Sequence, residues 1–138
     1  MKNALRNAAR WLRQAEYDLA QADRLLDQGV FSYAAFFAEQ SAQKSLKAFL
    51  LSRGMRFVAI HSVGELAKEA AGQDSRFRAL VDQGKRLDRH YLTSRYPDAL
   101  PEPAIPAEVY VREDAEEAVA VARAIFETAR SATRPPPQ

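Results

Sequence analysis

Apolar residues recur along most of the chain at alternating intervals of three and four, a spacing that places side chains on one face of an α-helix. The first run spans residues 5–26 and closes at Gly29, because glycine readily ends a helix. The second run spans residues 31–50 and closes at Gly54. Its many alanines allow close helix approach, as bundles and dimers require. The two stripes are Leu5, Ala8, Leu12, Ala15, Leu19, Ala22 and Leu26, and then Phe31, Ala34, Ala35, Ala38, Ala42, Leu46, Phe49 and Leu50.

Two further helices are predicted in the middle of the chain. Ser62 and Glu65 have the spacing of a capping box, so a short helix is expected over residues 63–72. Asp74 or Ser75 then caps a longer helix, whose stripe continues into a cluster of charged and aromatic residues. That stripe consists of Phe77, Leu80, Val81, Gly84, Leu87 and Tyr91.

The last third of the chain combines a proline-rich loop with one more helix. Prolines at 97, 101, 103 and 106 exclude regular helix over about fifteen residues, a loop length that is often functional. The last helix starts near Arg112, with acidic side chains in its first turns, where the helix dipole favours them. We therefore predict an all-α fold, an antiparallel four-helix up-and-down bundle with a short additional helix. It forms one domain over residues 1–131, and residues 132–138 form a flexible proline-rich tail.

Composition narrows the kinds of chemistry that are expected. The 138 residues suffice for one core, and 47% hydrophobic with 28% charged residues is typical of a globular protein. The chain has no cysteine, so disulfides, a thiol nucleophile and cysteine-ligated zinc are excluded. We expect no cofactor and no metal. The net charge of +2 means that any basic site is local. Without an apolar run of the ~20 residues that span a bilayer, or a signal peptide, we expect no membrane contact and a cytoplasmic location.

Residues 87–99 carry the densest chemistry of the chain. The run Arg95-Tyr96-Pro97-Asp98 provides a guanidinium for phosphate or carboxylate, a ring that can stack on a base, and an acceptor. In a structural alternative, Tyr96 fills the core while Arg95 and Asp98 hold the loop by a salt bridge and a turn. The candidate residues for binding a nucleotide or another ligand are Arg95, Tyr96, Asp98, Asp88, Tyr91 and Lys44.

A second set of candidates concerns catalysis. His90 beside Arg89, with Arg86 one turn earlier, has the groups for acid–base work on a phosphodiester, the arginine stabilising negative charge. The alternative is a helix C-terminus whose cations complement the dipole. Lys44 and Lys47 add positive charge to a site or else form a solvated face.

Three other residues have simpler interpretations. His61 precedes the capping Ser62 and is expected to hold the preceding loop by a hydrogen bond. Trp11 and Tyr17 lie off the main stripe of the first helix, which indicates a second apolar face and hence a partner subunit.

The order of these features resembles the HEPN domain, a small helical domain linked to nucleotide binding. The similarity covers nearly the whole chain except the tail. It rests on the first helix, on a long string in the second helix, on His61-Ser62 and on the string that ends in Arg-Tyr-Pro-Asp. These segments are residues 11–26, 33–48, 61–62 and 87–98.

The resemblance implies a helical bundle that dimerises and often works beside a separately encoded minimal nucleotidyltransferase, many such pairs behaving as toxin and antitoxin. It also implies, for many members, a metal-independent ribonuclease whose motif is an arginine, four to six residues, and a histidine. Here Arg86 and His90 have only three residues between them, and Arg89 has no histidine at that spacing. Arg56 and His61 match the spacing but lie in a predicted loop.

We therefore expect a dimeric module that binds a nucleotide or RNA and works with a minimal nucleotidyltransferase. Two alternatives remain open at this point. One is a metal-independent ribonuclease toxin that uses His90 with Arg86 or Arg89, and the other is a purely structural, partner-binding bundle.

Overall fold

The computed structural model describes residues 2–56 and 58–138, and within them every regular element is a helix. The predicted all-α fold is confirmed. None of these helices is both long and apolar enough to cross a membrane. The elements are α1 (Lys2–Asp27), α2 (Phe31–Ser52), α3 (Val63–Ala71), η1 (Ser75–Leu80), α4 (Val81–Asp88), α5 (His90–Thr93), η2 (Pro97–Ala99), α6 (Pro106–Val109) and α7 (Arg112–Ala132), where η denotes a 3-10 helix.

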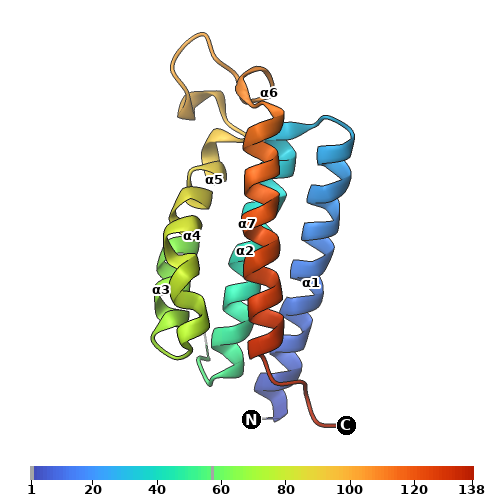
Figure 1. The fold of residues 1–138 in the computed structure, drawn as a ribbon, viewed down its shortest axis with the longest axis vertical. Coiled ribbons are helices and arrows are strands. Elements are labelled where there is room, and N and C mark those ends of the chain that lie inside the picture. Colours follow the sequence, from blue (N-terminus) through green and yellow to red (C-terminus); the bar gives the residue numbers. More distant parts are fainter. Residues whose placement is uncertain (1, 57) are drawn as a thin grey trace.

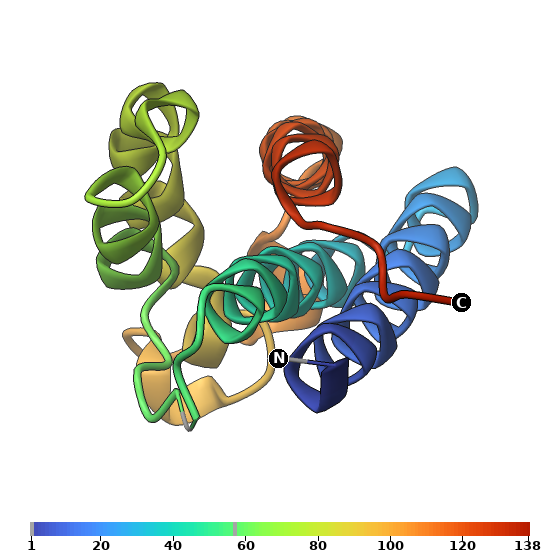
Figure 2. The ribbon, with the colours of Figure 1, turned by 90° about the horizontal axis from the view of Figure 1, so that it is seen from below.

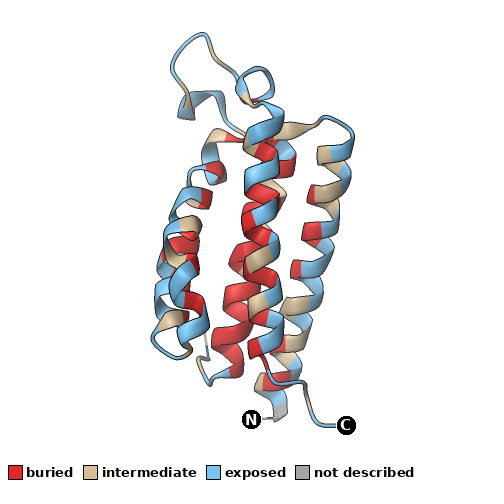
Figure 3. Cartoon of the chain, viewed as in Figure 1, coloured by how far each residue is buried: buried red, intermediate tan, exposed pale blue. Residues whose placement is uncertain are grey.

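The second helix, α2, is the centre of the bundle. Helix α1 runs antiparallel to α2 and lies on one side of it, and the α3–α4 pair lies on the opposite side (Figures 1 and 2). Helix α7 packs over α2 between these two sides (Figure 2). Buried residues face inward from all of these helices onto α2 (Figure 3). The alanines of its stripe have no exposed surface, so they serve close packing within this chain. They are Ala34, Ala35, Ala38 and Ala42.

The helix predicted from residue 75 to Tyr91 is interrupted. It starts as the 3-10 helix η1, continues as α4, and pauses at Arg89 before the single turn of α5. The hydroxyls of Thr93 and Ser94 donate to the carbonyl oxygens of Arg89 and His90, four residues earlier. Such bonds compete with backbone bonds and bend helices, which accounts for the short, irregular end of this segment.

The short helix α3 is attached to α4 at its N-terminus. The Asp88 carboxylate accepts hydrogen bonds from Ser62 Oγ at 2.7 Å, from the Val63 N–H at 2.6 Å and from the Gly64 N–H at 3.1 Å. Ser62 also caps the helix itself, accepting from the Glu65 N–H at 3.2 Å, as its position predicts. The α3–α4 pair is therefore held together where the dipole of α3 favours negative charge.

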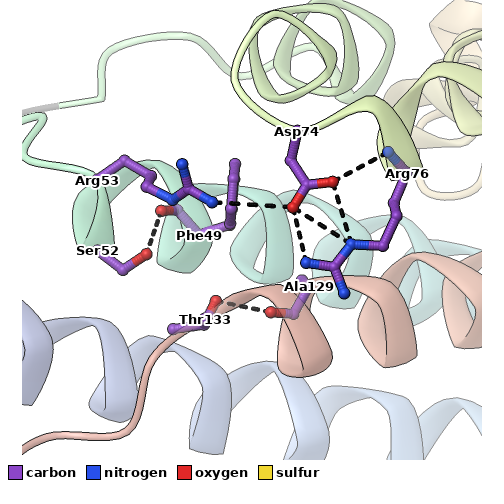
Figure 4. Close-up of polar contacts among 7 residues, drawn as sticks. All are labelled: Phe49, Ser52, Arg53, Asp74, Arg76, Ala129 and Thr133. Atoms are coloured by element: carbon purple, nitrogen blue, oxygen red, sulfur yellow. Dashed lines mark hydrogen bonds and ion pairs between the residues drawn. The ribbon is translucent and has the colours of Figure 1, made fainter.

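Polar contacts secure the far end of the bundle, where α2 and α7 end (Figure 4). Asp74 caps η1, accepts from the Arg76 guanidinium and lies 3.8 Å from Arg53, which follows α2. The Arg76 hydrogen bonds lower the pKa of Asp74 to about 2. At the end of α7 the Thr133 hydroxyl donates to the Ala129 carbonyl oxygen, and no regular element follows.

Candidate functional site

The side chain of Arg95 is fixed among aromatic rings just after α5. Its Nε and Nη2 atoms donate to the Tyr91 carbonyl oxygen at 3.0 and 2.7 Å. Its guanidinium carbon lies 4.2 Å from the ring centre of Phe36, 4.9 Å from that of Tyr91 and 4.8 Å from that of Tyr96. Cation–π contacts hold a guanidinium in place without removing its charge. Arg95 therefore presents a positioned positive charge and its remaining N–H donors.

A cavity of about 430 Å³ lies where Arg95 meets the start of α2. Its wall includes residues 29–33, Arg95 and the proline-rich loop at residues 105–107. Val30 precedes the first turn of α2 and no side chain caps that turn, so the N–H groups of the turn remain available. A helix N-terminus attracts anions, and an arginine beside it adds to that attraction. The cavity thus suits a phosphate or carboxylate group.

Three tyrosines surround this charged position and remain open to solvent. Tyr33, Tyr91 and Tyr96 are 51%, 45% and 50% exposed, so their rings are available for stacking on a base. The structural alternative in which Tyr96 fills the core is therefore wrong. The Arg95 guanidinium donates to the carbonyl oxygen of Tyr91 in α5, and no ion pair joins it to Asp98 within the described residues.

The other candidate binding residues lie apart from Arg95. Asp98 is exposed in η2, whereas Asp88 is engaged at the N-terminus of α3. Lys44 lies further along α2, where its Nζ is 2.5 Å from Asp18 Oδ2. The structure therefore brings together Arg95, Tyr91 and Tyr96 of the predicted set.

His90 lies in a closed ring of hydrogen bonds on the other side of α5. It is 4% exposed, its Nδ1 lies 2.6 Å from Tyr110 Oη, and Tyr110 Oη lies 2.9 Å from Thr93 Oγ1. The Arg89 Nε–H donates to His90 Nε2 at 3.4 Å. A neutral imidazole with its proton on Nδ1 satisfies every partner if the Tyr110 hydroxyl donates to Thr93.

Burial is the main cause of an unusually low pKa for His90, about 4, and the neighbouring Arg89 lowers it further. A histidine with such a pKa is neutral near pH 7 and is a weak base, and both of its ring nitrogens are already engaged. Arg86 points elsewhere, with its Nε 3.3 Å from Glu117 Oε1. The geometry brings Arg89 and His90 together, but it favours a structural role for the pair.

A buried polar cluster runs along α2 behind Arg95. Glu39 accepts from the Gln40 and Gln43 side-chain amides at 2.8 and 3.1 Å. Burial raises the pKa of Glu39 to about 7. Two turns further on, Lys47 is 5% exposed and its Nζ lies 3.1 Å from His61 Nδ1. Lys47 is therefore not on a solvated face, and His61 ties its loop to α2 as expected.

Several residues of this region were not among the sequence candidates. The Phe36 ring stacks on the Arg95 guanidinium, and the exposed Tyr33 lines the same cavity as Arg95. The first turn of α2 forms a wall of that cavity. The sequence held one signal for them, because Tyr33, Phe36, Phe37 and Gln40 recur at intervals of three and four and define a second, partly exposed stripe of α2. The described residues contain no group of three histidine or acidic side chains that could hold a metal ion.

The fold and this cluster define a small all-helical domain with a candidate anion site at one end of its central helix. A family model described as "HEPN domain" matches residues 8–132, so the chain belongs to the HEPN domain family. The match covers every helix that carries a candidate residue.

Individual relatives agree with this assignment. The chain is 28% identical over 130 residues to the protein named "Putative toxin MJ1304" of Methanocaldococcus jannaschii, and the match covers 89% of this chain and 86% of that protein. The crystal structure of TT1696 from Thermus thermophilus is similar with a TM-score of 0.84 and 34% identity, over 91% of this chain and 97% of that one. That of ST0689, titled an archaeal HEPN homologue, gives 0.73 and 30%, over 90% and 95%.

Proposed function

We propose that this HEPN-domain protein binds a nucleotide or RNA through Arg95 and the start of α2. The observation that carries the proposal is the position of the Arg95 guanidinium. Three aromatic rings hold it on the wall of a cavity that the N-terminus of α2 also lines. Phosphate suits the charge and the N–H groups, and bases suit the exposed tyrosines. A carboxylate ligand without a base would use the charge and the N–H groups but would leave the tyrosines unused.

Titration with ATP by calorimetry tests the proposal, comparing the wild-type protein with Arg95→Gln. Loss of the remaining N–H donors of Arg95 and of its charge should weaken binding at least tenfold, since charge-assisted hydrogen bonds contribute about 1.5–3 kcal/mol each. Binding with unchanged affinity in Arg95→Gln would contradict the proposal.

The matched control is Arg53→Gln. Arg53 stacks on Phe49 of the same helix, with its guanidinium carbon 4.9 Å from the ring centre, but at the opposite end of α2. The substitution removes the same charge and a similar cation–π contact, so it should leave ATP affinity unchanged. A thermal melt of each variant establishes that the bundle is intact.

We also propose a homodimer and a minimal nucleotidyltransferase partner, as in a toxin–antitoxin-like pair. The HEPN family assignment supports this proposal, and so does a relative that is named as a toxin. A neighbouring gene for a small nucleotidyltransferase, and co-purification of the two proteins, are the expected observations. A protein that remains alone when the two genes are co-expressed would contradict the partnership.

A further inference from the structure

A second cavity, of about 550 Å³, opens between α1 and α2 at a distance from Arg95. It combines basic and aromatic side chains, most of them from one stretch of α1. The residues that line it are Arg10, Trp11, Arg13, Gln14, Tyr17 and Lys44.

The charges of this second cavity are largely uncompensated. Arg10 and Arg13 are exposed, and neither forms an ion pair with a carboxylate in residues 2–56 or 58–138. Lys44 shares its charge with Asp18. The cavity therefore has a net positive charge, and an anionic ligand is the complementary occupant.

Aromatic rings give the same cavity a second kind of contact. Tyr17 is 61% exposed and Trp11 is partly buried beside it in the cavity wall. Grooves that combine positive charge with accessible aromatic rings bind single-stranded nucleic acids, because phosphates meet the charges and bases stack on the rings. The chemistry therefore favours a nucleotide unit over a simple anion.

Helix geometry relates this cavity to the cavity beside Arg95, which residues 29–33, Arg95 and residues 105–107 line and which is called the Arg95 site below. Tyr33 and Lys44 are separated by eleven positions on α2, close to three full turns, so both lie on one face of the helix, roughly 16 Å apart. At about 3.4 Å per nucleotide of a stacked strand, this separation corresponds to roughly five nucleotides. Phe37 and Gln40 lie on the same face between them and are partly exposed.

We infer that the cavity lined by Arg10, Trp11, Arg13 and Tyr17 is a second nucleotide subsite, and that the ligand is a single-stranded oligonucleotide. The strand follows the open face of α2 from the Arg95 site to this subsite. The inference rests on the proposed function, since the Arg95 site holds one part of the same strand.

Trp11 makes the inference directly measurable, because it is the only tryptophan of the chain. An oligouridine of about eight nucleotides, long enough to reach both sites, should quench its fluorescence by stacking. Uridine monophosphate should bind at the Arg95 site and leave Trp11 emission unchanged at concentrations that saturate that site. Calorimetry measures the mononucleotide affinity independently of Trp11.

The test variant is Arg10→Gln with Arg13→Gln. Loss of two phosphate contacts should weaken oligouridine binding roughly tenfold, and should reduce the slope of log affinity against log salt by about 1.4. Mononucleotide affinity should not change. The matched control is Lys68→Gln with Arg78→Gln, an equal charge loss at exposed positions of α3 and η1, and it should leave both affinities as they are.

Each remaining outcome overturns the inference. If the mononucleotide binds in an Arg95-dependent manner but oligouridine affinity is the same in the Arg10→Gln/Arg13→Gln variant, the subsite is refuted and the proposed function survives. If neither ligand binds, both fail. If Trp11 emission changes with protein concentration but not with added oligouridine, the inference is refuted, and the surface around Trp11 is a contact between copies of the protein.

Discussion

At the scale of single residues, burial gives two side chains unusual pKa values that act on stability in opposite directions. The pKa of His90 falls to about 4, so folding favours its neutral form. The pKa of Glu39 rises to about 7, so folding favours its protonated form. Groups that face His90 include Arg89, Asp114 and Glu117, while Asp88 and Arg95 face Glu39.

These two residues predict the pH dependence of stability. Between pH 4 and pH 6.5 the unfolded chain holds a proton on His90 that the folded protein lacks, so His90 makes stability rise with pH. Between pH 4.5 and pH 7 the folded protein holds a proton on Glu39 that the unfolded chain lacks, so Glu39 makes stability fall. The two slopes largely cancel between about pH 4.5 and pH 6.5.

Urea unfolding across this pH range separates the two contributions. Glu39→Gln removes the contribution that lowers stability as the pH rises. The free energy of unfolding of this variant should therefore increase by up to ~3 kcal/mol from about pH 4.5 to pH 6.5, whereas that of the wild-type protein should change little. His90→Gln should show the reverse, a profile that falls over the same interval. Parallel profiles for the wild-type protein and both variants would show that neither group has a shifted pKa.

At the scale of helices, Asp88 connects two elements that the sequence predicts separately. The capping box at Ser62 and Glu65 correctly predicts where α3 starts, because it is a local signal. The carboxylate that completes the cap comes from α4, more than twenty residues later, and no local pattern encodes that contact. The ligand role of Asp88 stays a prediction, and its three hydrogen bonds give it a structural role.

We expect Asp88→Ala to destabilise the protein by about 2 kcal/mol, because the N–H groups of Val63 and Gly64 lose a charged acceptor. Thermal unfolding monitored by circular dichroism measures the change. Asp82→Ala on the same helix is the control, since that side chain is 88% exposed and its only ion pair among the described residues, to Lys85, spans 4.0 Å. Equal melting temperatures for the two variants would refute the role of Asp88.

At the scale of the whole molecule, helix periodicity, caps and glycine stops predict the bundle, since these signals are local. The ends of α1 and α2 and the start of α7 agree with the prediction. The aromatic surroundings of Arg95 were only partly predictable, because Phe36 meets Arg95 from another helix. The ring of bonds that engages His90 depends on Tyr110, which lies beyond the proline-rich loop. Sequence proximity of Arg89 and His90 indicated catalysis, whereas burial and Tyr110 favour a fixed, neutral histidine.

The proposed homodimer also concerns the whole molecule. Helices α5 and α6 lie at the end of the bundle where α7 starts (Figure 1). Several large apolar side chains of this part of the chain are exposed. Exposed apolar groups at one end of a small domain are typical of a protein contact. They are Leu92, Ile105, Val109 and Val111, which are 49%, 38%, 42% and 50% exposed.

We therefore expect light scattering to give a mass near twice the chain mass of 15.5 kDa. Val109→Lys with Val111→Lys places two charges in the contact and should shift the protein toward the monomer, because burying unpaired charge is costly. Ala79→Lys with Ala120→Lys adds the same charge at exposed positions elsewhere and should leave the dimer intact. A wild-type protein that keeps the mass of one chain at every concentration would contradict the dimer. A dimer unaffected by the Val109→Lys/Val111→Lys variant would place the contact on another face.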